Sequence, residues 1–322
     1  MTVALGVVGF GIMGERLLRA TLAHDPAVIR LTGVWDPSAD AAGRLAAATP
    51  DVKMLTSPDD VIAACDALYI ATPPSSHLLY ARAAFAANKA VFLEKPLSED
   101  VAAARLFVAS AEAHGARAGV NFPMASSPAV AQLGVWRETM GRPRALTIHA
   151  EFATWPRAWQ QGAAEWLGKR AEGGFTREVL SHFLFLARRQ LGALVLLEGR
   201  VAYPTGDAAE SAVTARLTAG DVPVTLTGSV GTTDVDERNE WRLECEDGAI
   251  RLRDWSLAEK CDADGVFRPA PDAVENAAMR PLVLAGQLDK LAALTRGERT
   301  DLATLREALE VQEIVEAILA RP

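Results

Sequence analysis

A glycine-rich turn near the start of the chain has the spacing of a phosphate-binding loop. Gly9-Phe10-Gly11-Ile12-Met13-Gly14 follows an apolar run at residues 3–8 and precedes residues 15–23, whose pattern predicts a helix. The first glycine allows a tight turn, the second lets backbone N–H groups approach phosphate oxygens, and the third permits close helix–strand packing. The helix N-terminus adds unpaired donors and a partial positive charge. We interpret this turn as a dinucleotide pyrophosphate site, the alternative being an ordinary strand–helix turn.

An acidic residue stands where such a site would bind the adenosine ribose. Residues 30–35 read as a second short strand, and Asp36-Pro37 ends it, 25 residues after Gly11. A carboxylate there accepts hydrogen bonds from the ribose hydroxyls and repels a 2′-phosphate, which favours NAD over NADP. The alternative is an aspartate that only initiates a turn before proline. Arg44 nearby keeps NADP possible.

Two further polar segments follow predicted buried strands. Residues 67–71 lead into Thr72-Pro73-Pro74-Ser75-Ser76-His77, and residues 90–93 end at Glu94-Lys95-Pro96. Ligands of an open parallel sheet bind beyond the carboxyl ends of its strands, so we expect both segments beside the glycine turn. Lys95 lies between an acid and a proline that withholds an N–H. Lysines also end exposed strands, and His77 could simply occupy a surface position at a helix start, so both alternatives stay open.

The second half of the chain holds another candidate group. Gly173-Gly174 precede a predicted helix in which Glu178 and His182, four residues apart, share a face beside an apolar stripe. The pair could only stabilise the helix, or the histidine could be a hydrogen-bonded core residue. Two metal ligands are a further alternative, but no third ligand is evident, so we expect no metal.

Several tryptophans lie close together in the sequence, shortly before Gly173-Gly174. Trp155, Trp159 and Trp166 lie within twelve residues of one another, with Arg157 among them. Indole faces suit the apolar faces of sugars or an aromatic substrate, and Arg157 could bind a carboxylate. The alternative is packing at a domain or subunit junction. Arg177 is either a further substrate contact or the salt-bridge partner of the adjacent Glu178.

The elements that must position these residues predict an α/β protein of two domains. Through Phe122, short strands alternate with helices, including one at residues 98–113 with Ser98 as N-cap, which predicts a doubly wound parallel sheet of the Rossmann type over residues 1–122. Residues 123–322 predict an α+β domain with a large, mostly antiparallel sheet, one face packed on helices and the other broad enough for a subunit interface. Its strands are expected at residues 144–153, 194–202, 211–217, 222–230, 240–246 and 249–255, with helices at 128–140 and 302–319.

Composition narrows the class of ligand. The 322 residues carry a formal net charge of −8, which argues against a nucleic-acid partner and favours a small molecule. Cys65, Cys245 and Cys261 are widely separated and lack metal-site spacing, which fits a reducing compartment. No leader-like or membrane-spanning apolar run is evident, so we expect no membrane partner and a cytoplasmic location.

These motifs, at these separations, resemble the Gfo/Idh/MocA family of NAD(P)-dependent oxidoreductases, named for glucose-fructose oxidoreductase and inositol dehydrogenase. The resemblance rests on the glycine turn, the segment from Ala71 to His77 and Glu94-Lys95-Pro96. It implies that Thr72, Pro73, Pro74, His77 and Glu94 line the nicotinamide side of an NAD site and that Lys95 hydrogen-bonds the reacting oxygen. Gly141-Arg142-Pro143, Gly173-Gly174 and the terminal helix match the family more loosely. His182 matches a proton-transfer histidine, whereas Glu178 stands where the family usually has aspartate, a change of about one bond length in carboxylate position.

The resemblance implies an enzyme that moves a hydride between NAD(P) and a small polyol, sugar or related hydroxyl or carbonyl compound. Lys95, His182 and Glu178 would be catalytic, and Trp155, Arg157, Trp159 and Arg177 are the candidate substrate contacts. A homodimer or homotetramer through the second-domain sheet is expected. Two alternatives remain open, namely an NAD-dependent glycosidase of the same fold and a dinucleotide-binding regulator without turnover.

Overall fold

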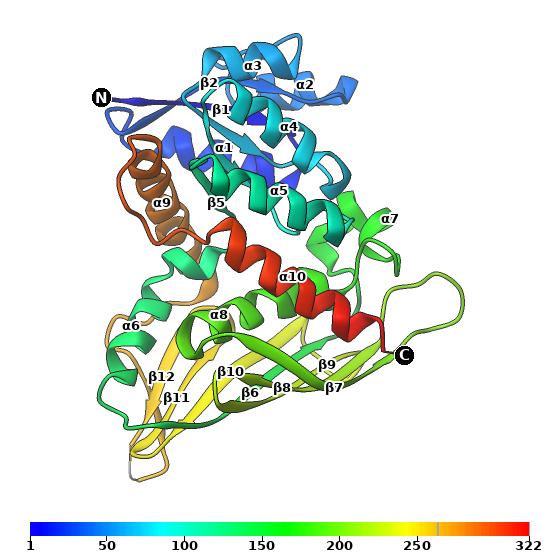
Figure 1. Cartoon of the computed structure of the whole chain (residues 1–322), viewed down its shortest axis with the longest axis vertical. Coiled ribbons are helices and arrows are strands. Elements are labelled where there is room, and N and C mark those ends of the chain that lie inside the picture. The colour runs from blue at the N-terminus through cyan, green and yellow to red at the C-terminus, as the bar shows by residue number, and fades with distance from the viewer. Residues whose placement is uncertain (263, 322) are drawn as a thin grey trace. The chain divides into compact units, whose positions relative to one another are not determined.

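The chain folds into two compact units, as the computed structural model in Figure 1 shows. The structure describes residues 1–262 and 264–321. The first unit comprises Met1–Ser126 and Pro281–Leu309, and the second comprises Ser127–Arg280 and Glu310–Pro322. The predicted second domain, residues 123–322, therefore differs from the observed one, because residues 281–309 belong with the N-terminal part.

The first unit contains a five-stranded parallel sheet in the order β2-β1-β3-β4-β5, which confirms the predicted Rossmann arrangement. All four residues of β3 and of β4 are buried, as expected where helices cover both faces of a parallel sheet. Strands and helices alternate along the chain: β1 (Val3–Val8), α1 (Ile12–Ala23), β2 (Ile29–Trp35), α2 (Ala39–Ala48), α3 (Pro58–Ala64), β3 (Ala67–Ile70), α4 (Pro74–Ala86), β4 (Ala90–Leu93), α5 (Val101–Ala113) and β5 (Ala118–Val120).

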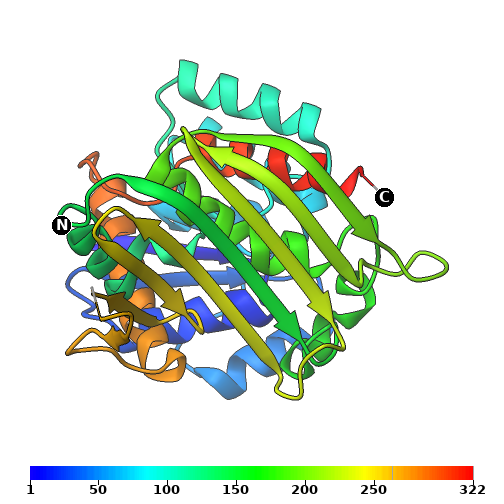
Figure 2. The same ribbon diagram turned by 90° about the horizontal axis from the view of Figure 1, so that it is seen from below.

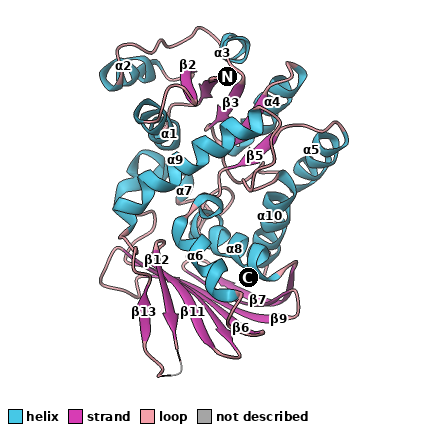
Figure 3. Ribbon diagram, turned by 90° about the vertical axis from the view of Figure 1, so that its left-hand side faces the viewer, coloured by secondary structure: helices cyan, strands magenta, loops and turns pink. Residues whose placement is uncertain are grey.

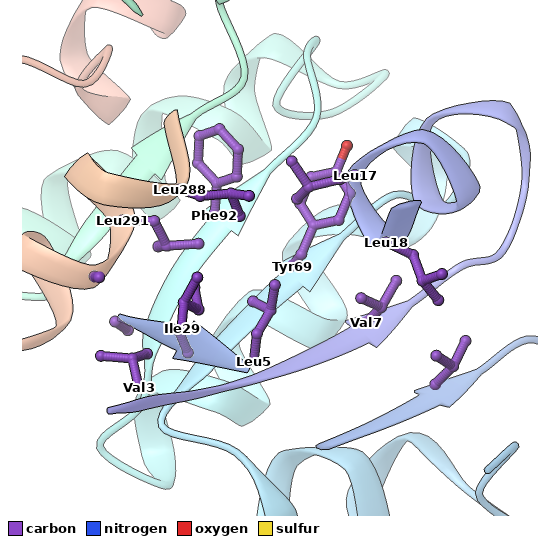
Figure 4. Packing of buried hydrophobic residues seen from close by; sticks show 14 of the residues in the cluster. Val3, Leu5, Val7, Leu17, Leu18, Ile29, Tyr69, Phe92, Leu288 and Leu291 are labelled. Atoms are coloured by element: carbon purple, nitrogen blue, oxygen red, sulfur yellow. The ribbon is translucent and has the colours of Figure 1, made fainter. Parts of the chain in front are cut away.

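A late helix completes the core of this unit. Figure 4 shows Leu288 and Leu291 of α9 (Asn276–Thr295) beside Tyr69 and Phe92, and all four side chains are fully buried. The backbone N–H of Val120 also donates to the carbonyl of Ala303, at 2.8 Å. Burial of this apolar surface, together with the backbone bond at the sheet edge, explains why residues 281–309 return to the first unit.

Helix α5 begins two residues later than its sequence suggests. The predicted N-cap was Ser98, but the structure places Asp100 there, with its carboxylate accepting from the N–H groups of Ala102 (2.8 Å) and Ala103 (3.2 Å). Ser98 lies outside the helix and accepts from the N–H of Asp100 at 3.2 Å. Both residue types suit an N-cap, so the sequence alone did not choose between them.

The second unit is built on an eight-stranded sheet in the order β13-β12-β11-β10-β6-β9-β8-β7. Only the neighbours β6 and β9 are parallel among the described pairs, which confirms the prediction of a mostly antiparallel sheet. The two strands nearest one edge, β12 and β13, were not predicted. The strands are β6 (Pro143–Phe152), β7 (Leu194–Ala202), β8 (Ala212–Ala219), β9 (Val222–Val230), β10 (Glu237–Cys245), β11 (Gly248–Arg253), β12 (Leu257–Cys261) and β13 (Phe267–Pro269).

One face of this sheet carries helices. Figure 3 shows α6 (Pro128–Arg137) and α8 (Ser181–Leu191) on the same side, where α6 contacts β11 and β12 and α8 contacts β7 and β8. Figure 2 views the opposite side, where no helix of the second unit is drawn in front of the strands. Alternation follows this arrangement, since Asn239, Trp241 and Leu243 of β10 are buried whereas the residues between them are partly exposed.

Several short helical segments lie between the longer elements along the chain. The turns η1 (Pro123–Ser126) and η2 (Ala158–Ala163) are 3₁₀ helices, α7 (Ala164–Leu167) is a single helical turn, and η3 (Thr176–Leu180) is a π turn that continues into α8. The last helix is α10 (Leu305–Leu319).

The cap of α5 gives a direct test of the helix start. Replacing Asp100 by alanine removes the acceptor for two backbone N–H groups, and we expect it to lower the free energy of unfolding by about 1 kcal/mol. Asp100→Asn keeps a side-chain oxygen and should lose far less. Urea denaturation of both variants measures the difference, and equal stability of the alanine and asparagine variants would contradict this assignment.

Candidate functional site

The glycine turn leaves room for a ligand at one glycine and none at the other two. Gly9 has a φ of +95°, and a Cβ on it would lie 2.6 Å from the carbonyl group of Ala71. A Cβ on Gly14 would lie 2.0 Å from the carbonyl oxygen of Gly9. A Cβ on Gly11 would meet no atom within 4 Å, directly before the start of α1. The open space in front of a helix N-terminus fits a pyrophosphate, and these residues are able to hold one.

The side chains of the other residues in this turn contact the protein itself. Phe10 is fully buried, and its guanidinium neighbour Arg44 lies 5.4 Å from the ring centroid and 3.9 Å from a carboxylate oxygen of Glu15. Ile12 and Met13 form the first turn of α1 and are half-buried, with the Met13 sulfur accepting from Arg16. The backbone N–H groups of this turn could therefore hold a cofactor more readily than its side chains could.

Asp36 is fixed at the end of β2 by two backbone donors. One oxygen accepts from the N–H of Phe10 at 2.6 Å, and the other accepts from the N–H of Ser38 at 2.8 Å. An ionised carboxylate has about four acceptor positions, so this geometry leaves capacity for the hydroxyls of a ribose. The first of these bonds also joins the predicted ribose-binding residue to the glycine turn.

His77 connects the loops that follow β3 and β4. It is fully buried at the start of α4, with Nε2 2.7 Å from the carbonyl oxygen of Thr72 and Nδ1 2.8 Å from that of Pro96. Burial lowers the pKa of His77, whereas the two carbonyls act in the opposite direction. The histidine is thus a buried internal contact and not the surface residue that was the alternative, and it could support a cofactor site by holding Thr72-Pro73-Pro74 in place.

Glu94 belongs to a buried polar network that sequence reasoning missed. The Tyr69 hydroxyl donates to Glu94, and the Asn121 amide donates to the same carboxylate oxygen at 2.5 Å. Gln287 of α9 in turn donates to the Asn121 side-chain oxygen at 2.7 Å. Burial, followed by the charge of Glu94, raises the pKa of Tyr69 well above its ordinary value. No local motif marks these partners, because they come from three separate elements.

Lys95 lies between two anchored neighbours. The N–H of Glu94 donates to the carbonyl of Ile70 at 3.0 Å, and the carbonyl of Pro96 faces His77. The peptide bond between Lys95 and Pro96 is cis. Since the backbone on each side is held, the start of the Lys95 side chain is fixed at the sheet edge that also carries the glycine turn, while the residue itself is partly exposed.

In the second unit, Gly173-Gly174 allow two close approaches. A Cβ on Gly173 would lie 2.2 Å from the carbonyl oxygen of Leu167, and a Cβ on Gly174, whose φ is +99°, would lie 2.1 Å from a carboxylate oxygen of Glu210. Glu210 is buried, its pKa is raised by that burial, and it accepts from the N–H of Thr176 at 2.7 Å. The glycine pair thus brings a buried carboxylate against the start of the π turn.

Glu178 and His182 lie on different kinds of helix. Glu178 is in the π turn and His182 in the first turn of α8, where the sequence predicted one regular α-helix. π turns of this kind occur frequently at functional sites. The neighbouring Arg177 donates twice to Glu316 of α10, at 2.6 and 2.7 Å, and this pairing gives its guanidinium a structural role without a substrate.

Arg157 also binds a carboxylate within the protein. Its guanidinium is buried, donates to Glu237 at 2.7 Å, and lies 5.5 Å and 4.8 Å from the ring centroids of Trp155 and Trp159. The Trp155 indole donates to the carbonyl of Leu167, whereas Trp159 is 48% exposed. Of these candidate substrate contacts, Trp159 presents its ring to solvent and Arg157 has its charge balanced.

Trp255 is another residue that the sequence did not indicate. It lies in the turn between β11 and β12, where Asp254 and Trp255 have φ values of +49° and +71° and the N–H of Ser256 donates to the carbonyl of Arg253. Such turns favour Asn-Gly, and a bulky residue in this conformation is strained by roughly 1–3 kcal/mol. Its ring contacts His182 edge-to-face, with the centroids 5.5 Å apart.

Among residues 1–262 and 264–321, no group of three or more histidine, cysteine or acidic side chains is placed to hold a metal ion. None of the described helices is long and apolar enough to cross a bilayer.

Comparisons with known proteins agree with this geometry. The family described as "Oxidoreductase family, NAD-binding Rossmann fold", Gfo/Idh/MocA, matches residues 3–122. Inositol 2-dehydrogenase of Cereibacter sphaeroides is 35% identical over 121 residues, which cover 36% of this chain and 35% of that enzyme. The match thus spans about a third of the length of this relative.

Solved structures extend the likeness over both units. UDP-N-acetylglucosamine 3-dehydrogenase of Acidithiobacillus ferrooxidans has a TM-score of 0.80 at 19% identity, covering 99% of this chain and 97% of that one. An oxidoreductase of Agrobacterium radiobacter in complex with NAD⁺, L-tartaric acid and magnesium has a TM-score of 0.81 at 16% identity, covering 98% and 94%. At such identities these structures show the fold alone.

The fold and the glycine turn define an NAD-binding Rossmann domain joined to an α+β domain. The match over residues 3–122 identifies that domain further, as similar to the NAD-binding Rossmann domain of the Gfo/Idh/MocA oxidoreductases.

The open space at Gly11 predicts a defect in cofactor binding without a defect in folding. Gly11→Ala places a methyl group where the phosphates would lie, so we expect NADH affinity to fall at least about tenfold. The backbone there is extended, with a φ of −78°, and accepts alanine, so the melting temperature without cofactor should stay the same. NADH fluorescence titration and thermal denaturation measure the two quantities.

Gly43 provides the matched control, because a Cβ there also meets no atom within 4 Å but the residue lies within α2. Gly43→Ala should keep NADH affinity. If Gly11→Ala binds NADH as tightly as Gly43→Ala, the phosphate position is wrong.

The buried His77 predicts a pH dependence of stability. Because burial holds its pKa below the ordinary value of 6.5, the unfolded chain takes up a proton that the folded protein resists as pH falls through 6.5. This contribution to the free energy of unfolding is therefore present above pH 6.5 and lost below it, at up to about 1.4 kcal/mol per pH unit.

We expect His77→Gln to be less stable than the natural protein at pH 7.5 but to lose less stability between pH 7.5 and 5.5. Urea denaturation across this range gives both slopes. Parallel curves for the two proteins would show that His77 is not the group responsible.

Proposed function

We propose that this protein is an NAD-dependent dehydrogenase or reductase that acts on the CH–OH group of a small polyol, sugar or related compound. The observation that carries the proposal is the joining of Lys95 to the phosphate-binding edge of the Rossmann sheet. His77 ties the Lys95-Pro96 segment to the loop after β3, and a Cβ on Gly9 would lie against that same loop at Ala71. These contacts hold the start of a cationic side chain at the sheet edge that carries the glycine turn, which supports a place for Lys95 beside the cofactor.

The reaction explains why a lysine is needed. NAD⁺, when bound, accepts the hydride that leaves the carbinol carbon. Loss of that hydride develops double-bond character between carbon and oxygen while the hydroxyl proton departs, so the oxygen passes through alkoxide character. An ammonium within about 3 Å of the oxygen stabilises this charge, and we assign that role to Lys95.

The proton requires a second group, for which we propose His182. A histidine changes charge near neutral pH and can take the hydroxyl proton in oxidation or return it in reduction. Glu178, one turn earlier, would orient the imidazole or hold a substrate hydroxyl. Its position in a π turn supports a role in function, and the aspartate usual in the family would place its carboxylate about one bond length closer to the backbone.

A neutral, polyhydroxylated substrate suits the second unit better than an acid. The pair of Arg157 and Glu237 balances the charge beside the tryptophans, and the exposed face of Trp159 is able to pack against the apolar face of a sugar or cyclitol ring. The inositol 2-dehydrogenases among the relatives support the same class.

We further propose a homodimer or homotetramer that uses the face of the large sheet lacking helices (Figure 2). Such a face is broad enough for a subunit interface. Three free, buried cysteines support a reducing location such as the cytoplasm.

Cofactor titration followed by a substrate screen tests this function. We expect NADH to bind more tightly than NADPH, because Asp36 accepts ribose hydroxyls and repels a 2′-phosphate. Cyclitols, sugars and sugar acids with NAD⁺, and the matching ketones with NADH, would then be screened by absorbance at the nicotinamide band. Cofactor binding without turnover of any compound would favour a regulator, and turnover without net change in NADH would favour the glycosidase alternative.

Lys95→Met should separate binding from chemistry. The substitution keeps the length of the side chain but removes its charge, so we expect NADH affinity within about threefold of the natural protein and kcat lower by about a thousandfold. Lys53→Met, at an exposed lysine of the same unit, serves as the control and should leave both unchanged. Natural turnover by Lys95→Met with the true substrate would exclude the proposed role.

A further inference from the structure

We propose that Trp255 is a positioning residue for His182 and that Glu237 holds Trp255 in place. The inference rests on the proposed function in that His182 is taken as the proton-transfer group. Three sets of contacts and one backbone conformation within the second unit carry it, and the contacts join Arg157 with residues from β10, the turn after β11 and the first turn of α8.

The first contact is the packing of the two rings. The Trp255 and His182 rings meet edge-to-face at 74°, and Phe183 packs against the same indole with its centroid 5.1 Å away. A single indole therefore contacts two consecutive residues at the start of α8. Rings packed in this way restrict each other's rotation, which would hold the His182 imidazole in one orientation.

The second contact fixes the indole itself. Its Nε1–H donates to Oε1 of Glu237 at 2.7 Å, and the Asn239 amide donates to the same oxygen at 2.9 Å. The other oxygen of Glu237 accepts from Arg157 at 2.7 Å. Both carboxylate oxygens are thus bound, so the acceptor for the indole cannot turn away without breaking charged hydrogen bonds.

The third contact holds the backbone of the turn. The Asn239 side-chain oxygen accepts from the N–H of Trp255 at 3.1 Å, and the Asn239 carbonyl accepts from the N–H of Asp254, also at 3.1 Å. Glu237 and Asn239 are two residues apart on β10 and therefore point to the same face of the sheet. Glu237 therefore holds the ring of Trp255, and Asn239 holds its backbone.

The fourth observation is the backbone conformation of Trp255. Its φ of +71° lies in the region where glycine is favoured and a bulky side chain is an outlier. The turn would form more easily with glycine, so local folding does not explain the tryptophan. Strained residues of this kind gather at functional sites, and the contact that the strain maintains here is the one with His182.

The contacts also connect residues that the sequence indicated separately. From Trp159 the path runs through Arg157 to Glu237, then through Trp255 to His182. The loop proposed to bind substrate and the residue proposed to move its proton are thus joined by two residues that have no motif of their own.

The test compares Trp255→Phe, which keeps a ring but loses the indole N–H, with Trp255→Leu, which loses the ring. Trp136→Phe is the matched control, because Trp136 is a half-buried tryptophan of α6 in the same unit. Melting temperatures establish that each variant is folded. If Trp255→Leu does not fold, Trp255→Phe decides the question.

The first readout is the histidine side-chain nitrogen spectrum of ¹⁵N-labelled protein, in which loss of a signal in His182→Gln assigns His182 among the five histidines. An imidazole held in one orientation keeps the same hydrogen-bond partners, and these partners set its tautomer. We expect a single tautomer in the natural protein and in Trp136→Phe, and nitrogen shifts averaged between tautomers in both Trp255 variants. An unchanged His182 tautomer in the folded Trp255 variants would overturn the proposal.

The second readout is turnover with the best substrate from the screen. We expect kcat to fall about tenfold in Trp255→Phe and about a hundredfold in Trp255→Leu, with NADH affinity unchanged, because misplacement of a catalytic group by about an ångström has effects of this size. A kcat within twofold of the natural value in both variants would also overturn the proposal. If the natural protein shows no turnover at all, the proposed function fails, while the nitrogen spectrum still decides whether Trp255 positions His182.

Discussion

The close approach of two backbone segments is the constraint on which the first unit depends. The turn after β1 lies so near the start of the loop after β3 that a Cβ on Gly9 would be 2.6 Å from the Ala71 carbonyl. Glycine is therefore required at residue 9 for packing as well as for its positive φ. This contact fixes the glycine turn relative to the loop that begins at Thr72. His77 contacts the carbonyls of both Thr72 and Pro96, so the segment at Pro96 is held relative to the same loop. The position of the Lys95 backbone follows from these contacts.

The first unit was largely predictable because its determinants are local. A strand buried on both faces reads as a continuous apolar run, and Gly9, Gly11 and Gly14 mark the turn that follows. The error at the start of α5 is of the expected kind, since Ser98 and Asp100 are both good caps and only the tertiary structure shows which one the helix uses. The helix spanning residues 276–295 was missed, and its place in the core depends on Tyr69 and Phe92, which lie on strands much earlier in the chain.

The candidate site was predictable only in part, because its supporting residues are nonlocal. The sequence indicated Glu94 but not its hydrogen-bond network of Tyr69, Asn121 and Gln287. These residues are far apart in the sequence and meet only in the fold. It indicated Arg157 as a possible ligand for a carboxylate, whereas the structure supplies that carboxylate from within, as Glu237. The sequence did not indicate Trp255, for a different reason. Asp254-Trp255 does not resemble the Asn-Gly of such a turn, so the sequence pattern there argued against the conformation that the chain adopts.

Each unit holds a carboxylate in a hydrogen-bond network beside a residue proposed for chemistry, and the two networks differ in their donors. Glu94 is buried and accepts from a tyrosine hydroxyl and an asparagine amide, which compensate for the loss of water around the carboxylate. Glu237 is paired with Arg157, whose side chain is 9% exposed, so that group is close to neutral overall. The N–H of Glu94 donates to the carbonyl of Ile70, and this bond holds the backbone next to Lys95 at the sheet edge. Glu237, paired with Arg157, accepts from the indole of Trp255, which packs against His182. The two proposed catalytic residues would therefore be supported in different ways, Lys95 by an anchored backbone and His182 by ring packing.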